Sequence, residues 1–530
     1  MEKLLLLGDE AIAQAALDAG ISGVYAYPGT PSTEITEYIQ AASKTQSEGI
    51  HSAWCVNEKT AMEAALGMSF AGKRSLVCMK HVGVNVAADA FMNAALTGVV
   101  GGLVFVAADD PSMHSSQNEQ DSRFFGQFAM IPILEPSNQQ EAYQMTYEGF
   151  DLSERYGIPV MLRITTRLAH SRSGVVKLKE RAQNEIHFSS NPRQFVLLPA
   201  NARIQYQKLL EAQAHFLEAS EVSKFNLKLE GSDLSKGIIA SGIAFNYLME
   251  NYPNGCPFPV LKIGQYPIPE KAISEMAVAC SELIVLEEGY PLIEDALSGL
   301  KGFGLTIRGR KDGFLPRAGE LNPDIVAASF GLQITKSRNT PEVVMSRPPS
   351  LCVGCGHRDL YEALNEAIES KGSDCKVFGD IGCYTLGYLP PFQSIDTCVD
   401  MGASITMAKG ASDAGLGYPV AVIGDSTFTH SGMTALLDAV NENASITVII
   451  SDNETTGMTG GQDSSGTGKL EAICLALGVE PEHLHVLVPL KKNHVEMVQL
   501  IKKEMEYKGT SVIIPRRECI QTLGRKKKKA

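Results

Sequence analysis

Two polar clusters in the last third of the chain could hold a metal ion. Gly424-Asp425-Ser426 comes directly after one apolar run, and Asn453 lies just beyond a second apolar run. If these runs are neighbouring parallel strands, their carboxyl ends lie at one edge of a sheet, where α/β proteins bind ligands. The oxygens of Asp425 and Asn453, with the backbone carbonyl of Thr455, suit Mg²⁺ shared with a diphosphate. Polar strand ends occur in any α/β protein, so this pattern alone is only moderately specific.

A second motif, Cys352-Val-Gly-Cys355-Gly-His357, could be mistaken for a zinc site. Zinc needs a second pair of ligands at suitable spacing, none stands out, and His357 adds one ligand at most. We therefore interpret the segment as a glycine-rich cofactor loop containing Gly354, Gly356 and His357. The odd total of eleven cysteines, without a secretory signal, predicts reduced thiols and a cytoplasmic protein.

Apolar runs that alternate with helical segments must position these residues. Leu4–Leu7 and Val24–Tyr27 read as the first two strands, and Thr30 is expected to cap a helix whose first residue is Pro31. Continuous apolar strands separated by helices predict parallel sheets covered on both faces. We expect an α/β fold of three doubly wound domains, at 1–173, 237–334 and 351–515. A connecting region at 174–236, which holds a helix at Ala202–Ala219, separates the first two domains. A linker at 335–350 precedes the third domain, and a basic tail at 516–530 follows it.

Composition excludes several classes of protein. The chain has 530 residues, of which 44% are hydrophobic and 20% charged, so it is neither disordered nor fibrous. A net charge of −13 argues against nucleic-acid binding. The most membrane-like stretch, Val86–Ala108, contains Asp89 and Asn93, so we expect a buried helix and strand and no membrane contact. The spacing of 72–110 resembles that of 417–453, which leaves duplication and convergence equally open.

The motifs resemble, in their order, those of enzymes that use thiamine diphosphate (TPP). More specifically, they resemble the α subunits of the indolepyruvate branch of the 2-oxoacid:ferredoxin oxidoreductases. The similarity covers about residues 1–515 and rests on the metal–diphosphate pattern, on CVGCGH, and on the segments Tyr27–Ile35, Val56–Lys59, Lys80–Asp89, Asp109–Arg123, Gly379–Tyr384 and Asp400–Ile405.

The resemblance implies a pyrimidine-binding domain, a transketolase-C-like domain and a diphosphate-binding domain, in that order. It implies that TPP is held by Gly354, Cys355, Gly356, His357, Gly382, Cys383, Met401, Gly402, Gly424, Asp425, Ser426, Asn453 and Thr455. Mg²⁺ would be bound by Asp425, Asn453 and Thr455.

The resemblance also suggests three residues for the chemistry. Glu58, at the start of a helical stretch, would contact the aminopyrimidine and assist the cofactor as general base. Without the resemblance it would be an ordinary acid at a helix N-terminus. Arg123 would bind the substrate carboxylate through its bidentate fork. Thr30 would contact the substrate, a role compatible with capping a helix.

The implied reaction is oxidative decarboxylation of an aryl 2-oxo acid such as indolepyruvate, giving aryl-acetyl-CoA, CO₂ and reduced ferredoxin. The implied partners are coenzyme A, ferredoxin and a β subunit, in a dimer or heterotetramer. Such α subunits carry [4Fe–4S] clusters bound by closely spaced cysteines. No such run occurs here, so we expect no cluster on this chain and electron exit through a partner. A non-oxidative 2-oxoacid decarboxylase and a non-catalytic TPP-binding subunit remain the alternatives. The basic residues 525–529 could dock ferredoxin or form a solvated tail.

Overall fold

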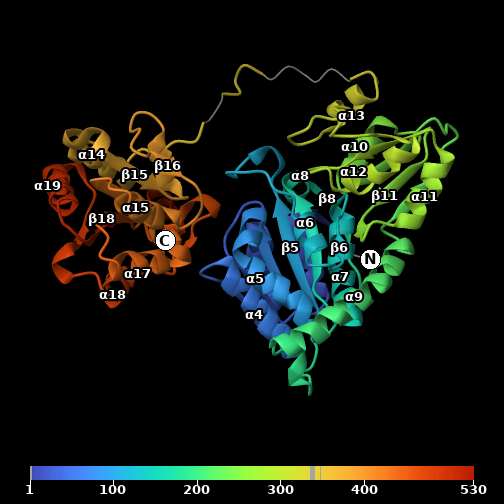
Figure 1. Cartoon of the computed structure of the whole chain (residues 1–530), viewed down its shortest axis with the longest axis horizontal. Helices are drawn as coiled ribbons and strands as arrows, with labels where there is room; N and C mark the ends of the chain where they lie inside the picture. Colours follow the sequence, from blue (N-terminus) through green and yellow to red (C-terminus); the bar gives the residue numbers. More distant parts are fainter. Residues whose placement is uncertain (1–2, 335–340, 346–347, 530) are drawn as a thin grey trace. The chain divides into compact units, whose positions relative to one another are not determined.

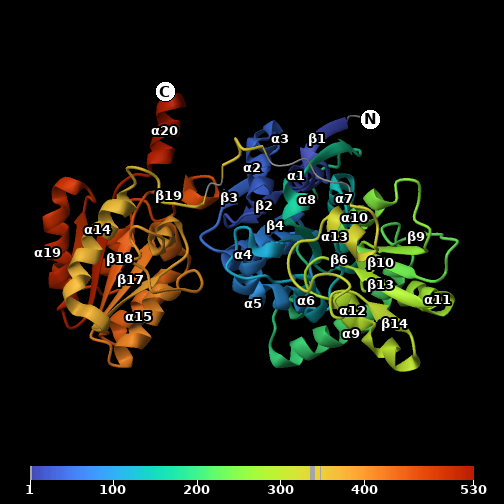
Figure 2. The ribbon, with the colours of Figure 1, turned by 90° about the horizontal axis from the view of Figure 1, so that it is seen from above.

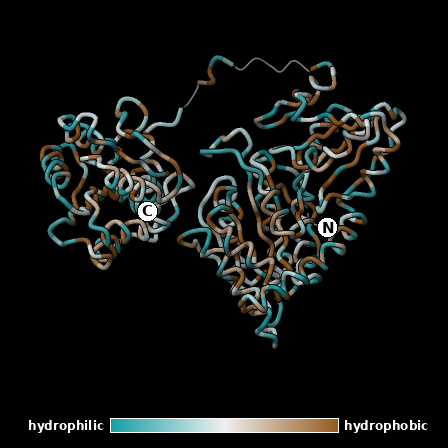
Figure 3. Tube along the Cα trace, in the orientation of Figure 1, coloured by the Kyte–Doolittle hydropathy of each residue, from teal (hydrophilic) through white to brown (hydrophobic). Residues whose placement is uncertain are grey.

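The computed structural model describes residues 3–334, 341–345 and 348–529. It divides into two compact units, Met1–Arg338 and Asn339–Ala530. The division falls within the segment 335–350 that we expect to be a linker, of which 335–340 and 346–347 lie outside the described residues. Figure 3 shows hydrophobic segments running through the interior of each unit.

A seven-stranded sheet forms the first half of unit one. All neighbouring strands are parallel except β12 and β6, which are antiparallel. The strand order is β12 (Gln265–Tyr266), β6 (Ile133–Leu134), β7 (Val160–Thr165), β5 (Leu103–Asp109), β4 (Ser75–Lys80), β2 (Gly23–Ala26) and β3 (His51–Trp54).

Helices cover both faces of this sheet (Figure 1). Successive side chains of a strand point to opposite faces, so Leu76 and Cys78 of β4 enter one core while Val77 and Met79 enter the other. The first core includes α1 (Gly8–Asp18) and α7 (Gln139–Tyr156), and the second includes α4 (Glu58–Phe70) and α5 (His81–Thr97).

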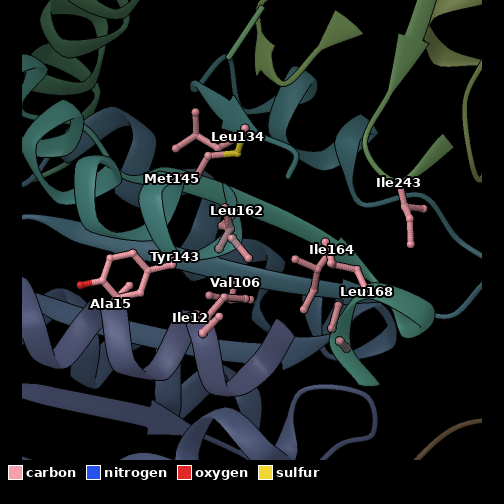
Figure 4. Packing of buried hydrophobic residues seen from close by; sticks show 14 of the residues in the cluster. Ile12, Ala15, Val106, Leu134, Tyr143, Met145, Leu162, Ile164, Leu168 and Ile243 are labelled. Carbon is pink, nitrogen blue, oxygen red and sulfur yellow. The ribbon is translucent and has the colours of Figure 1, made fainter. Parts of the chain in front are cut away.

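The first of these cores is formed by long apolar side chains from helices and strands. Figure 4 shows Ile12 of α1 and Tyr143 of α7 packed with Val106 of β5 and Leu162 of β7. All four side chains are essentially inaccessible to solvent. The sheet is thus a rigid base that fixes where its strand ends, and the polar residues that follow them, lie.

A five-stranded sheet forms the rest of unit one. Its order is β14 (Thr306–Arg308), β13 (Glu282–Leu286), β10 (Gly237–Ser241), β11 (Val260–Ile263) and β9 (Leu227–Leu229), with only β9 antiparallel. The chain leaves β11 and immediately adds β12 to the edge of the seven-stranded sheet. The two sheets of unit one are therefore interlocked.

Two local features of unit one differ from expectation, and a third, the helix of the connecting region, agrees with it. The first strand, β1 (Lys3–Leu7), pairs antiparallel with β8 (Arg172–Val176) in a separate two-stranded sheet. The first helix after β2 is α2 (Thr33–Ala41), and its N-cap residue is Ser32. Thr30 is therefore not the cap of this helix and lies in the preceding turn, where the Ser32 hydroxyl donates to the Gly29 carbonyl at 2.8 Å. The connecting region holds α9 (Pro199–Glu221), whose Phe216 is buried against the second core.

Unit two contains a six-stranded, wholly parallel sheet. Its order is β16 (Thr397–Cys398), β15 (Cys375–Gly379), β17 (Tyr418–Gly424), β18 (Ile446–Ser451), β22 (Thr510–Pro515) and β21 (Leu484–Leu487). One face packs against α14 (Gly356–Ile368) and α19 (His494–Met505), and the other against α15 (Ala403–Asp413) and α17 (Met433–Asn441) (Figure 2). The fold is α/β with three mainly parallel sheets, as the sequence predicts.

Two further observations bear on expectations at the surface. The region that we expected as a basic tail forms a helix, α20 (Ile520–Lys529), and Arg525 donates to the Gly460 carbonyl. Across the part of the chain that the structure describes, no helix combines the length and apolar character needed to cross a bilayer.

Candidate active site

The predicted metal ligands follow β17 and β18, which are parallel neighbours. Gly424 pairs with Ser451, so Asp425 and the residues after Ser451 leave the sheet at the same level. Asp425 is 2% exposed, and its Oδ2 has no hydrogen-bond donor among the described residues. Burial raises the pKa of Asp425 to about 7. A buried carboxylate oxygen without a partner is costly, and a divalent cation would satisfy it. This side chain therefore fits a Mg²⁺ ligand.

The loop after β18 is folded tightly around Asn453. The backbone N–H of Thr455 donates to Asn453 Oδ1 at 3.2 Å, an Asx-type turn. The Thr456 hydroxyl donates to the Ser426 hydroxyl at 3.0 Å and so joins the loops that follow β17 and β18. These contacts place Asp425 and Ser426 next to the loop that holds Asn453 and Thr455.

One residue that sequence reasoning missed, Asp380, organises two of the predicted glycine-rich loops. It is fully buried at the end of β15 and accepts from the N–H groups of Gly402 at 2.8 Å and Ser404 at 3.1 Å. Gly402 has a φ of 94°, which suits glycine. Asp380 thus ties Gly402 and Met401, at the start of α15, to the loop that holds Gly382. Its position directly after Gly379 in the sequence was the available signal.

The CVGCGH segment surrounds the N-terminus of α14 and faces this same edge. Gly354 has a φ of 81°, which suits a turn. His357 is buried, and burial lowers its pKa to about 4, so the imidazole is neutral near pH 7. The Cys355 Sγ lies 3.2 Å from His357 Nδ1. A β-carbon on Gly356 would lie 3.2 Å from the Pro489 side chain, so the turn leaves little room there.

Four cysteines that are scattered in the sequence come together here. Cys352, Cys355, Cys383 and Cys519 line one cavity of about 120 Å³, together with Asn453. Burial, and after it the neighbouring thiols, raise the pKa of Cys383 to about 12. Four thiols that line one cavity are the type of donor set that binds an iron–sulfur cluster.

This cavity bears on two expectations. The sequence alone offers no second cysteine pair beside Cys352 and Cys355, because Cys383 and Cys519 are distant along the chain. Folding brings them together because the segments after β15 and β22 leave the same edge of a parallel sheet. The proximity of four thiols removes the reason to expect no cluster on this chain.

In unit one, Glu58 is the first residue of α4. The Asn57 side chain accepts from the Thr60 N–H at 2.9 Å, which caps the helix and fixes where Glu58 begins it. Glu58 is 5% exposed, and its carboxylate lies against Gly83 in the first turn of α5. A β-carbon at Gly83 would lie only 2.7 Å from Glu58 Oε1. Gly83 is therefore the residue that makes room for this carboxylate.

Thr30, Glu58 and Lys80 follow three adjacent strands, β2, β3 and β4. The register pairs Ala26 with both Trp54 and Cys78, so these strands end at nearly the same level. Thr30 is half-buried in the turn after β2. A β-carbon on Gly29 would lie 3.3 Å from the Lys80 β-carbon. Lys80, which was not singled out from the sequence, thus joins Thr30 and Glu58 at the carboxyl edge.

Arg123 does not lie in this group. Its side chain is fully buried and contacts Asp121 at 2.5 Å, Glu287 at 3.0 Å and Glu135 at 3.7 Å. Its remaining donors reach the Ser241 and Tyr266 hydroxyls and the Tyr290 carbonyl. A guanidinium enclosed by three carboxylates has no donor left over, an arrangement that does not favour the expected contact with a substrate. Arg123 instead joins the two sheets of unit one.

A second arginine extends this buried network. Arg163 bonds to Asp109 at 2.8 Å and to Glu135 at 2.6 Å. Acids outnumber the two arginines, and burial raises the pKa of Glu287 and of Glu288 to about 7. Burial therefore favours the protonated form of Glu287 and Glu288, which reduces the excess of negative charge in the network.

Comparison with known proteins matches a segment of each unit to a described family. Residues 14–215 match the family described as pyruvate flavodoxin/ferredoxin oxidoreductase, thiamine diP-binding, and residues 380–514 match the thiamine pyrophosphate enzyme C-terminal TPP binding domain. Among solved structures, the chain is similar to 2-oxoglutarate:ferredoxin oxidoreductase from Magnetococcus marinus, at 15% identity with a TM-score of 0.48, covering 62% of this chain and 65% of that one.

Curated relatives match over almost the whole chain. Indolepyruvate oxidoreductase subunit IorA of Methanothermobacter thermautotrophicus is 38% identical over 99% of this chain and 88% of its own length. The subunit of the same name from Archaeoglobus fulgidus is 39% identical over 98% of this chain and 86% of its own length. The chain therefore belongs to the family of the indolepyruvate oxidoreductase subunit IorA.

Proposed function

We propose that this chain is the catalytic α subunit of an enzyme that oxidatively decarboxylates aryl 2-oxo acids such as indolepyruvate. The acid, coenzyme A and two oxidised ferredoxins would give the aryl-acetyl-CoA, CO₂, two reduced ferredoxins and a proton. A β subunit would complete the enzyme, as a dimer or heterotetramer in the cytoplasm. The observation that carries the proposal is the unpartnered, buried oxygen of Asp425 in a TPP-binding domain of an IorA relative.

The residues of unit two would hold the cofactor's charged end. Asp425, Asn453 and Thr455 offer the hard oxygens that Mg²⁺ prefers. Gly424 and the short helix that starts at Asp425 allow phosphate oxygens to approach the backbone closely. The neutral imidazole of His357 adds no positive charge to this edge. When bound, TPP would supply the electron sink for decarboxylation.

The residues of unit one would act on the cofactor's other end and on the substrate. The Glu58 carboxyl group, fixed at the start of α4 and against Gly83, would hold a proton next to a ring nitrogen of the aminopyrimidine. Thr30, in the turn after β2, would contact the substrate. Because Arg123 is committed to Asp121, Glu135 and Glu287, it takes no part in this proposal.

The four-cysteine cavity supplies a route for electrons. We propose that Cys352, Cys355, Cys383 and Cys519 bind one iron–sulfur cluster, since four thiolates are its usual ligands and oxidation of the substrate must release two electrons. Zinc is also bound by four thiolates in proteins but could not carry electrons. Iron and sulfide analysis of anaerobically purified protein tests this. Cys383→Ser should lose the iron, whereas Cys256→Ser, in unit one, should keep it. Stoichiometric zinc in the absence of iron would overturn the proposal of an iron–sulfur cluster.

The proposed reaction is tested with the chain purified together with its partner subunit. Indolepyruvate-dependent reduction of a viologen dye is measured with TPP, Mg²⁺ and coenzyme A present. We expect reduction that requires coenzyme A, vanishes in Glu58→Gln and persists in Glu63→Gln, an exposed acid of the same helix. Release of CO₂ and free aldehyde without dye reduction would instead identify a non-oxidative decarboxylase. TPP binding without any turnover would identify a non-catalytic subunit.

A further inference from the structure

Lys80 is a buried cation at the end of β4. Its side chain is 8% exposed, and it precedes the first residue of α5. Its ammonium group donates to the Ser115 carbonyl at 2.6 Å and to the Ser115 hydroxyl at 3.3 Å. An ammonium has three donors, so one N–H is not used by these contacts.

No carboxylate neutralises Lys80 directly. Within the described ranges no ion pair forms at Lys80, and Asp110 acts only at longer range, because its oxygens accept from Ser115, Ser116 and Thr166. Burial lowers the pKa of Lys80 to about 8. Burying a charge without a counter-ion is unfavourable, whereas Arg123 is enclosed by three carboxylates. An anionic ligand would correct this imbalance.

The surroundings of Lys80 indicate where such an anion would lie. Its β-carbon faces the Gly29-Thr30 turn, and the Glu58 carboxylate lies against Gly83, three residues further along. No side chain caps the first turn of α5. Lys80 therefore lies beside the groups that would act on cofactor and substrate.

We propose that Lys80 binds the carboxylate of the 2-oxo acid, the task that the sequence first suggested for Arg123. The ammonium would keep its two bonds to Ser115 and direct its third donor at the substrate carboxylate. Together with the N-terminus of α5, it would give the site a preference for anionic over neutral ligands. This inference rests on the proposed function.

The first test measures turnover. Lys80→Met should lower kcat/KM for indolepyruvate about 100-fold, as expected when one partner of a desolvated, charged hydrogen bond is lost. Lys80→Arg, which keeps the charge, should recover part of this loss. Lys59→Met removes a half-exposed lysine from the neighbouring helix and should leave turnover unchanged. If wild-type protein turns over no 2-oxo acid, the proposed function fails and this inference fails with it.

The second test separates binding of the carboxylate from general damage to the fold. Hydrocinnamate and its neutral amide, hydrocinnamide, have the aryl side chain but cannot be decarboxylated. In the holoenzyme we expect hydrocinnamate to inhibit about tenfold more strongly than the amide, and this preference should vanish in Lys80→Met and persist in Lys80→Arg. Equal inhibition by the two compounds in wild-type enzyme, or an unchanged preference in Lys80→Met, would overturn the inference while leaving the proposed function standing.

Discussion

Replacing Gly83 by alanine should disable Glu58 without unfolding the protein. The new β-carbon would lie 2.7 Å from Glu58 Oε1, and 2.7 Å from its Cγ, far inside ordinary contact distance. To restore a contact of about 3.5 Å, the carboxylate must move by roughly 0.8 Å. Misplacement of a catalytic group by about 1 Å can cost on the order of 100-fold in rate. The displaced atoms belong to a side chain, so the backbone of α4 need not move.

Stability should change little, because alanine is intrinsically better than glycine in a helix by about 1 kcal/mol and offsets part of the overlap. Gly67→Ala is the matched control: Gly67 lies in α4, and a β-carbon there would meet nothing within 4 Å. Dye reduction and thermal unfolding are measured for both variants. We expect about 100-fold slower turnover in Gly83→Ala only. Wild-type turnover in Gly83→Ala would refute the reasoning, because Glu58 would then not need its observed position.

Three further outcomes are expected. The pKa of Asp425 is about 7, and metal binding requires the ionised carboxylate. The apparent affinity of the protein for TPP with Mg²⁺, measured by calorimetry, should therefore be about tenfold weaker at pH 6 than at pH 8. Equal affinities at the two pH values would contradict a role for Asp425 as metal ligand. Arg123→Met should lower the free energy of unfolding of unit one by about 3–5 kcal/mol, because it leaves buried carboxylates without their counter-ion. A raised KM for the substrate with unchanged urea denaturation would instead support a substrate-binding role for Arg123. Burial, and then the charge of Glu34, raise the pKa of Asp9 well above its usual value, so its contribution to stability is complete at acid pH and is lost as pH rises through that pKa. Asp9→Asn should therefore raise the unfolding temperature at pH 7 and weaken its pH dependence, and a lower unfolding temperature would oppose this.

Features that depend on strand ends were predictable from the sequence. Asp425 and Asn453 each follow an apolar run, and parallel strands place such residues at one edge whatever the details of packing. The start of a helix at Glu58 was predictable because helical periodicity begins there, whereas the role expected for Glu58 came from the family resemblance. In both cases the local sequence pattern and the sheet topology predict the same position for the residue.

Features that depend on distant partners were not predictable. The bonding partners of the Arg123 guanidinium include Glu287 and other groups that lie more than a hundred residues away in the sequence. Its motif alone therefore suggested a guanidinium that is free to bind substrate. The four-cysteine cavity depends on Cys383 and Cys519, which no spacing rule connects. Lys80 was overlooked because a lysine in a sequence is normally solvated, and only the structure shows that it is buried.

The crossing of β12 into the seven-stranded sheet has a consequence for biosynthesis. As the chain emerges from the ribosome, β6 has no neighbour on its outer side until Gln265 and Tyr266 have been made. The buried arginines must likewise wait for Glu287 and Glu288. The N-terminal sheet therefore keeps an open edge while about 130 further residues are translated, and its two buried arginines have only part of their partners. Such a state is prone to misassembly. Nascent chains stalled before this point should bind chaperones, and those stalled beyond it should resist proteolysis.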